Sequence, residues 1–356
     1  MKKALGILVL MVAIGIFTAL AADGFLTAYN LENLLRRTAL FGILAIGAGL
    51  VIMAGGIDLS TGSVVCLAGC MLPWLLVDHG WSPPAAVAAI VAAGIAIGLF
   101  QGWLVAWARL QPFLVTLCGL LFYRGLARGF TEDQTQGFRG GFEELRSLAT
   151  GRIPVPGLTD LEAFDGPSAF AVPAPVASLV VIAVLAAFLL RYTVWGRWLL
   201  ATGRNPQAAA YSGVPVKWVT LSAFVLGAVL SAYGGMLFVL DVGSAQPADF
   251  GNFYELYAIA AAVLGGCSLR GGEGSVVGIV VGAALMQVLR NALVLVDWIP
   301  DNLEYAVIGA VILLGVLADE LVRRVARRHS RLPLETSGSP QAREARNEPA
   351  VRSDRS

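Results

Sequence analysis

Long apolar runs separated by short polar stretches make up most of this chain. Ten runs are long enough to be considered as spans of about 30 Å of hydrocarbon: residues 4–22, 38–54, 60–77, 84–108, 112–130, 174–191, 218–240, 255–267, 275–297 and 303–319. The eighth run is short for a complete span, which indicates a broken helix. The pattern predicts an all-α integral membrane protein of about ten transmembrane helices, some short or broken, in one domain over residues 1–321.

The first run fits two descriptions. Lys2 and Lys3 precede it and Ala19-Leu20-Ala21 ends it, as in a signal peptide with its cleavage site. The run is also long enough to span a bilayer. We expect an uncleaved first helix, because ten spans then place both termini on one side of the membrane.

Composition excludes a soluble protein. The chain is 57% hydrophobic and 14% charged, whereas soluble domains carry about 25% charged residues. The formal net charge of +1 gives no reason to expect a nucleic-acid partner. The four cysteines lie in or beside apolar runs without a histidine nearby, so no metal site is predicted.

Lysine and arginine gather in the connections on one side, which the positive-inside rule assigns to the cytoplasm. Arg36 and Arg37 are exceptions on the other side, together with arginines of the loop at 131–173. We expect a bacterial inner-membrane protein with both termini cytoplasmic, a periplasmic loop at 131–173 and a cytoplasmic loop at 192–217. The polar tail at 322–356 is predicted to be disordered, with its first arginines against membrane lipid.

The run Gly55-Gly56-Ile57-Asp58-Leu59-Ser60-Thr61-Gly62-Ser63 interrupts two apolar segments. A charge at the centre of a membrane helix costs roughly 3 kcal/mol, and a broken helix must satisfy its backbone within protein or against water. Asp58 or Ser60 is suited to cap the helix that begins near Thr61. Contact of Asp58 with a substrate, or a role in proton relay, is the alternative.

A partial copy of this run follows later in the chain. Gly265-Gly266 precedes Leu269 and then Gly274-Ser275-Val276-Val277, as Gly55-Gly56 precedes Leu59 and Gly62-Ser63-Val64-Val65. Helix breaks at matching positions of a repeat indicate a transport pathway, although small residues recur in any membrane helix. Asn291 and Arg290 add polar groups to the ninth run. The predicted path and break residues are Gly55, Gly56, Asp58, Ser60, Gly265, Gly266 and Asn291.

The loop at 192–217 contains a short helix signal. Asn205 can cap a helix, Pro206 suits its first position and Gly213 can end it. Tyr211 is predicted to protrude from this surface helix, which either docks in a groove of a partner or is a simple connector. Its candidate docking residues are Gly203, Asn205, Pro206, Ala208, Ala209, Tyr211 and Gly213.

The chain lacks a phosphate-binding loop of its own. No G-x-x-x-x-G-K-[ST] run is present, so the chain does not cradle ATP in that way. We predict no enzymatic activity and no cofactor in this chain, with any energy supplied by a partner.

Four motifs carry a resemblance when taken together and in order. They are the Gly55–Ser63 run, Gln111-Pro112-Phe113-Leu114-Val115-Thr116-Leu117, the Gly203-x-Asn205-Pro206-x-Ala208-Ala209 loop, and Gly265-Gly266 with Gly274-Ser275-Val276-Val277-Gly278. Over about residues 30–320 the chain resembles the permease subunits of carbohydrate ABC importers, the ribose, xylose, arabinose and galactose branch, and looks most similar to the galactofuranose-type permeases.

This resemblance implies a ten-helix permease that pairs with a second, identical or paralogous permease. It also implies ATPase subunits, which hold ATP and Mg²⁺, and a periplasmic sugar-binding protein. The Asn205–Gly213 loop would then be the coupling helix that fits an ATPase groove. The expected function is translocation of a pentose or hexose by alternating access, driven by ATP.

Two other functions remain open at this point. An ion-coupled secondary transporter would place paired ionisable residues at mid-membrane, where Asp58 and Arg290 are the candidates. A non-transporting membrane scaffold would need neither broken spans nor a docking helix. The particular sugar is not fixed by these motifs.

Overall fold

The described residues of the computed structural model are 2–22, 24–154, 170–295, and 306, 307, 309, 310 and 313. Most of the predicted run at 303–319 and the whole tail at 322–356 lie outside them. The long helices are α1 (Lys2–Ala21), α2 (Ala28–Met53), α3 (Thr61–Pro73), α4 (Pro83–Ala106), α5 (Pro112–Thr131), α7 (Ala174–Tyr192), α10 (Val216–Val242), α11 (Tyr254–Leu264) and α12 (Val276–Leu295). This architecture confirms the predicted all-α membrane fold.

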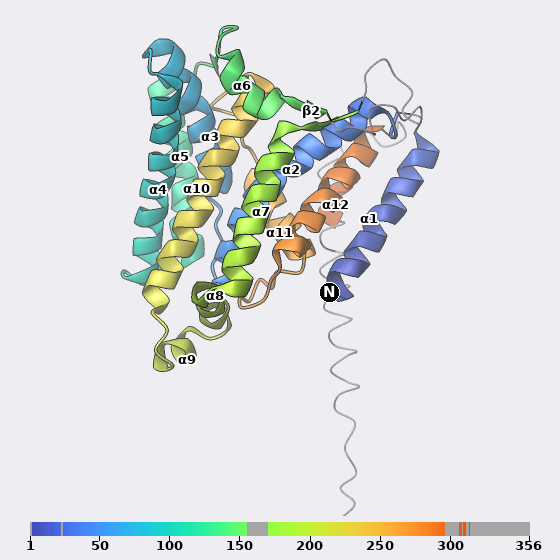
Figure 1. Cartoon of the computed structure of the whole chain (residues 1–356). Helices are drawn as coiled ribbons and strands as arrows, with labels where there is room; N and C mark the ends of the chain where they lie inside the picture. The colour runs from blue at the N-terminus through green and yellow to red at the C-terminus, as the bar shows by residue number, and fades with distance from the viewer. Residues whose placement is uncertain are drawn as a thin grey trace, which may run out of the picture. The chain divides into compact units, whose positions relative to one another are not determined.

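The connections carry shorter elements. They are a π-helical turn at Trp74–Asp78 that continues α3, the helices α6 (Glu143–Thr150), α8 (Val194–Arg204) and α9 (Pro206–Tyr211), and the strands β1 (Gln136–Gly137), β2 (Arg152–Pro154), β3 (Ala171–Pro173) and β4 (Ser244–Ala245). β1 pairs antiparallel with β4, and β2 with β3. In Figure 1, α9 lies at one end of the long helices and α6 at the other. These are called the α9 end and the α6 end below.

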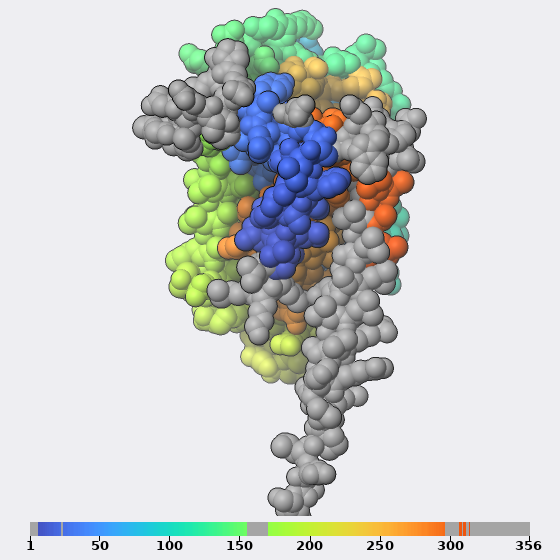
Figure 2. Space-filling model, turned by 90° about the vertical axis from the view of Figure 1, so that its right-hand side faces the viewer, coloured from blue at the N-terminus to red at the C-terminus, as the bar shows by residue number. Residues whose placement is uncertain are grey.

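Seven described helices are long and apolar enough to cross a membrane, with α3 counted through Asp78. The helix α11 is short, as the sequence predicts for the eighth run, and α1 is apolar over Gly6–Ala21. Figure 2 shows α1, in blue, on the surface of the helix assembly, where it packs mainly against α12.

Helix α2 is at the centre of the described helices. Of its most apolar window, 83% is buried, against 17% for α7 and 28% for both α4 and α5. It packs against α10, α12, α11 and α7. Since α4, α5 and α7 expose leucine, valine and phenylalanine side chains at the length of a membrane span, their outer faces suit contact with lipid or another membrane helix.

The most extensive packing of two long helices joins α4 to α10. Gly94, Gly98 and Gly102 recur every four residues along α4 and face α10. A Cβ at Gly98 would lie 2.8 Å from the Phe224 carbonyl oxygen and would overlap the backbone of Val225. Small residues at this spacing let two membrane helices approach through their backbones.

We expect Gly98→Leu to lower the thermal unfolding midpoint in detergent by about 1–4 °C, because overpacking costs roughly 1–3 kcal/mol. Gly125→Leu on α5 is the matched control, since no atom lies within 4 Å of a Cβ built there. Equal midpoints for the two variants would contradict the close α4–α10 contact.

Candidate functional site

The first interruption begins with a glycine turn at the end of α2. Gly55 has φ +90°, and the N–H groups of Gly55 and Gly56 donate to the carbonyl oxygens of Ile52 (2.9 Å) and Val51 (3.0 Å). This is the Schellman pattern, in which a residue with positive φ satisfies the last carbonyls of a helix. The Gly55 side of the break is therefore fixed by backbone geometry.

Asp58 orders the rest of this break, but it does so differently from the predicted helix cap. Its Oδ1 accepts hydrogen bonds from Ser60 N (2.8 Å) and Ser60 Oγ (2.6 Å), and Ser60, at the cap position of α3, makes no capping bond with its side chain. The prediction of a cap by either side chain is wrong, because the Asp58 carboxylate accepts from Ser60, which precedes α3, and the Ser60 hydroxyl accepts from Gln101 instead of an N–H of α3. Asp58 closes a tight turn of its own instead.

Two neighbouring helices hold this turn in place. Gln101 of α4 donates from Nε2 to Ser60 Oγ at 2.9 Å, and Thr116 of α5 donates from Oγ1 to the Ile57 carbonyl oxygen at 3.1 Å. Asp58, Ser60, Gln101 and Thr116 are all buried. The polar groups of the break thus find partners within protein, as membrane burial requires.

The second interruption repeats the first, one residue out of the register predicted from the sequence. Gly266, with φ +96°, donates to the Val263 carbonyl oxygen, and Cys267 donates to that of Ala262. Gly266 is therefore equivalent to Gly55, and Gly265 to Ala54. The Gly-Gly pairs in the sequence suggested that Gly265 is equivalent to Gly55. The residue with positive φ marks the equivalent position instead.

A further junction, which the sequence analysis did not single out, joins the beginnings of α3 and α11. A Cβ at Gly62 would overlap both Glu255 Oε2 and the Gly251 carbonyl oxygen. The Glu255 carboxylate lies beside the backbone of Gly62, in the first turn of α3, and of its own residue. One buried carboxylate therefore serves the positive ends of two interrupted helices. Its only sequence signal is an acid in the first turn of a short apolar helix.

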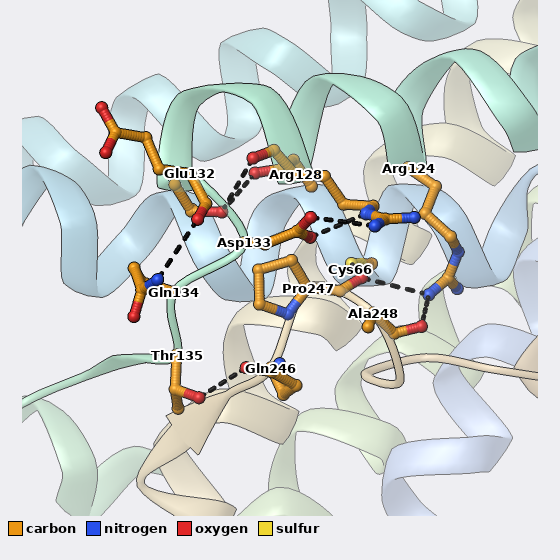
Figure 3. Close-up of polar contacts among 12 residues, drawn as sticks. Cys66, Arg124, Arg128, Glu132, Asp133, Gln134, Thr135, Gln246, Pro247 and Ala248 are labelled. Carbon is orange, nitrogen blue, oxygen red and sulfur yellow. Dashed lines mark hydrogen bonds and ion pairs between the residues drawn. The ribbon is translucent and has the colours of Figure 1, made fainter.

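The segment 246–253 connects the α6 end to this junction. Figure 3 shows Arg124 of α5 reaching across to it: Nη1 donates to the Pro247 and Ala248 carbonyl oxygens at 3.4 and 3.1 Å. Cys66 Sγ of α3 donates to the same Pro247 oxygen at 3.3 Å. The Phe250 ring lies over Gly69. The segment is thus fastened to two helices.

The beginning of the 246–253 segment is also fastened to the loop at 131–173. β4 pairs with β1, and Thr135 Oγ1 donates to Gln246 Oε1 at 2.5 Å. Nearby, Arg128 donates from Nε to Asp133 Oδ1 at 2.7 Å, and this bond holds the pKa of Asp133 below its usual value. The 246–253 segment therefore links the surface of the α6 end with the interior.

The short surface helix predicted in the loop at 192–217 is present as α9. Asn205 Oδ1 accepts from Ala208 N at 3.0 Å, Pro206 is its first residue, and Gly213 follows with φ +83°. Tyr211 is 94% exposed, the most exposed large apolar side chain of the described residues. Ala208 is exposed, but Ala209 is buried, so the two alanines do not present the same surface.

Asn291 lies away from both breaks. It exchanges two side-chain hydrogen bonds with Asn30 in the first turn of α2 (3.0 and 2.7 Å), whereas the break follows the last residue of that helix. The separation along α2 is roughly 35 Å at 1.5 Å per residue. The neighbouring Arg290 lies over the Tyr257 ring, 5.2 Å from its centroid. The contacts of Asn291 are those of a helix-to-helix clamp.

The other predicted residues come together at the α9 end. Gly203 of α8 lies against Gly55, with a Cβ on Gly55 3.5 Å from Gly203 Cα. Gly265 packs on the Gly278 backbone of α12. Interrupted membrane helices at matching positions of a repeat are typical of membrane transport proteins.

The comparisons with known proteins name the class. The chain belongs to the family described as the permease component of the branched-chain amino acid transport system, which matches residues 30–316. It is 34% identical over 333 residues to the xylose transport system permease protein XylH of Haemophilus influenzae, covering 82% of this chain and 88% of the relative. No solved structure matches it.

Two Escherichia coli K12 proteins are similar too. The xylose transport system permease protein XylH is 32% identical, covering 83% of this chain and 86% of the relative. The ribose import permease protein RbsC is 35% identical, covering 82% and 85%. The predicted membership of the sugar-permease branch is confirmed, as is a multi-pass membrane transport subunit rather than an enzyme. The likeness to galactofuranose-type permeases stays a prediction.

Substitution of Asp58 separates a shaping role from proton relay. We expect Asp58→Asn to keep substrate uptake within about threefold of wild type, since its amide oxygen can still accept from Ser60. We expect Asp58→Ala to lose most uptake, because it leaves the buried donors of Ser60 unpaired, at a cost of about 1–3 kcal/mol. Uptake assays at matched membrane abundance measure both. Loss of uptake in Asp58→Asn as complete as in Asp58→Ala would support proton relay instead.

Removal of the Arg124 contacts should loosen the 246–253 segment. In Arg124→Met, the Pro247 and Ala248 carbonyls lose their guanidinium donor. Cys66 is buried beneath the segment, so we expect its reaction with maleimide to become several times faster. Mass spectrometry of the labelled protein measures this rate. Arg128→Met is the control because, in the described part of the chain, Arg128 pairs with Asp133 at the surface. Identical Cys66 labelling in both variants would contradict this role of Arg124.

Proposed function

We propose that this chain is the membrane permease of an ATP-driven importer and that it passes a sugar, a pentose or hexose, by alternating access. The observation that carries the proposal is α9: a capped, exposed helix at one end of a membrane domain whose curated relatives are named for xylose and ribose transport. Such a helix suits the groove of a partner. The ATP and Mg²⁺ would be held by that partner.

The proposed orientation places the α9 end, and both termini, in the cytoplasm. Basic residues of the α9 end support it under the positive-inside rule; they include Arg109, Arg191, Arg197, Arg204 and Lys217. Several arginines of the α6 end are held in ion pairs with acids, namely Arg36–Asp241, Arg139–Asp78 and Arg152–Glu32. Three of the exceptions noted in the sequence thus have acidic partners.

The proposed path runs past the first interruption. Gln101 Oε1 is buried and has no hydrogen-bond partner among the described residues, so it can accept from a sugar hydroxyl. The turn at Asp58 and Ser60 lies beside it. Breaks that line a path supply polar groups without the cost of an extra buried charge. Asn291 is better explained as a clamp between α2 and α12.

The proposed partners are an ATPase subunit at the α9 end, a periplasmic sugar-binding protein at the α6 end, and a second permease beside this one. Strand pairing and ion pairs give the α6 end an ordered surface for the binding protein. The exposed apolar faces of α4, α5 and α7 suit lipid and the second permease, identical or paralogous.

Reconstituted uptake tests the function. In vesicles containing the permease, ATPase and binding protein, we expect labelled-sugar uptake that requires ATP and persists when ionophores remove ion gradients. Ala208→Glu should reduce uptake at least about tenfold by weakening the docking of α9. Ala108→Glu, an exposed alanine near the end of α4, is its control.

Uptake that persists without ATP but collapses with the ion gradient would establish a secondary transporter. No uptake under any condition, by a complex that assembles and binds sugar, would favour a scaffold. Equal uptake by Ala208→Glu and Ala108→Glu would remove α9 from the coupling role.

A further inference from the structure

Three segments that are distant in the sequence meet at the α9 end through their backbones. They are the end of α2 at Met53–Gly55, the end of α8 at Gly203–Arg204, and the turn Gly271–Gly272 between α11 and α12. The Gly272 N–H donates to the Met53 carbonyl oxygen at 3.0 Å. That oxygen is one of the helix-end acceptors that α2 cannot satisfy itself. We call this meeting point the glycine joint.

Glycine is required at each side of the joint for close approach. A Cβ on Gly203 would overlap the Met53 carbonyl oxygen and lie 2.5 Å from Gly272 N. A Cβ on Gly271, which has φ +81°, would lie 2.6 Å from the Gly203 oxygen and 2.9 Å from Gly55 Cα. All of these neighbours are backbone atoms, which cannot move aside as a flexible side chain can. The joint is therefore a stack of three backbones.

The joint is directly connected to the docking helix. Asn205 alone separates α8 from α9, and its N–H donates to the Ala201 carbonyl oxygen at 3.1 Å, so a displacement of α9 reaches Gly203 over two residues. Arg204 and Glu273 add an ion pair at 4.0 Å with side chains 78% and 50% exposed. Such an exposed pair contributes little, and the backbone contacts carry the connection.

From these contacts we infer that the glycine joint is the positioning element through which movement of α9 reaches both interrupted helices at once, with Gly203 its central residue. Gly203 touches the α2 end, which leads into the Asp58 turn, and the Gly271–Gly272 turn, which leads from the second break into α12. Since Gly203 and Gly271 meet backbone atoms, no side chain absorbs a shift at these two contacts, and the three segments move together. This inference rests on the proposed role of α9 as the docking helix.

Hydrogen exchange on the wild-type complex tests the inference without a mutation. The permease with its ATPase is placed in lipid nanodiscs and compared without nucleotide and after trapping with ATP and vanadate. We expect exchange to change together in peptides covering 52–57, 202–213 and 268–275, by about tenfold at the Gly272 amide. A change confined to 202–213 would overturn the inference, and no change in any of the three would contradict both it and the docking role.

Glycine substitution gives the second measurement. In assembled Gly203→Ala complexes that hydrolyse ATP, sugar uptake per ATP hydrolysed should fall by about tenfold or more, within the usual range of coupling energies. Gly129→Ala on α5 is the control, because its added methyl meets open space. Wild-type coupling in an assembled Gly203→Ala complex would overturn the joint while leaving the proposed function intact. If Gly203→Ala does not assemble, the exchange result decides alone.

Discussion

An interrupted helix inside a membrane must satisfy its backbone within the protein, and this constraint shapes the centre of the molecule. Each break begins with a glycine turn of the same kind, whose N–H groups donate to carbonyl oxygens near the end of the preceding helix. Beyond the first turn, the Asp58 carboxylate and the helices α4 and α5 supply the remaining partners. The buried polar residues around α3 are therefore there to hold an irregular backbone in one shape.

Close backbone approach is the second consequence of the same constraint. Gly62 lets the Glu255 carboxylate reach the beginnings of two helices, and Gly203 lets three chain segments stack at the α9 end. The α4 glycines bring α4 against α10 in the same manner. Without a hydrophobic driving force between helices in lipid, packing at such short range holds the bundle together. The residues proposed to serve transport and those that enable folding thus overlap.

The two ends of the bundle differ in how they are built. At the α6 end, short strands, ion pairs and the Arg124 contacts fasten the 246–253 segment to the surface. At the α9 end, a short capped helix protrudes and the contacts beneath it are backbone to backbone. In the proposed function, the α6 end receives a binding protein and the α9 end transmits the movement of an ATPase. The difference between the two ends agrees with these two roles.

The sequence by itself determined the membrane class, most of the spans in the described part of the chain, and the local structure of α9, because these follow from hydrophobic length and from capping residues close in sequence. The exception is α2, which begins at Ala28, ahead of the apolar run predicted at 38–54. The sequence also located both breaks. Only the tertiary structure decided how the two breaks align, since the residue with positive φ, and not the Gly-Gly pair in the sequence, marks the equivalent position. The same holds for the partner of Asp58, the role of Glu255, the Asn30–Asn291 clamp and the glycine joint, because each depends on contacts between segments far apart in the chain, which no local pattern encodes.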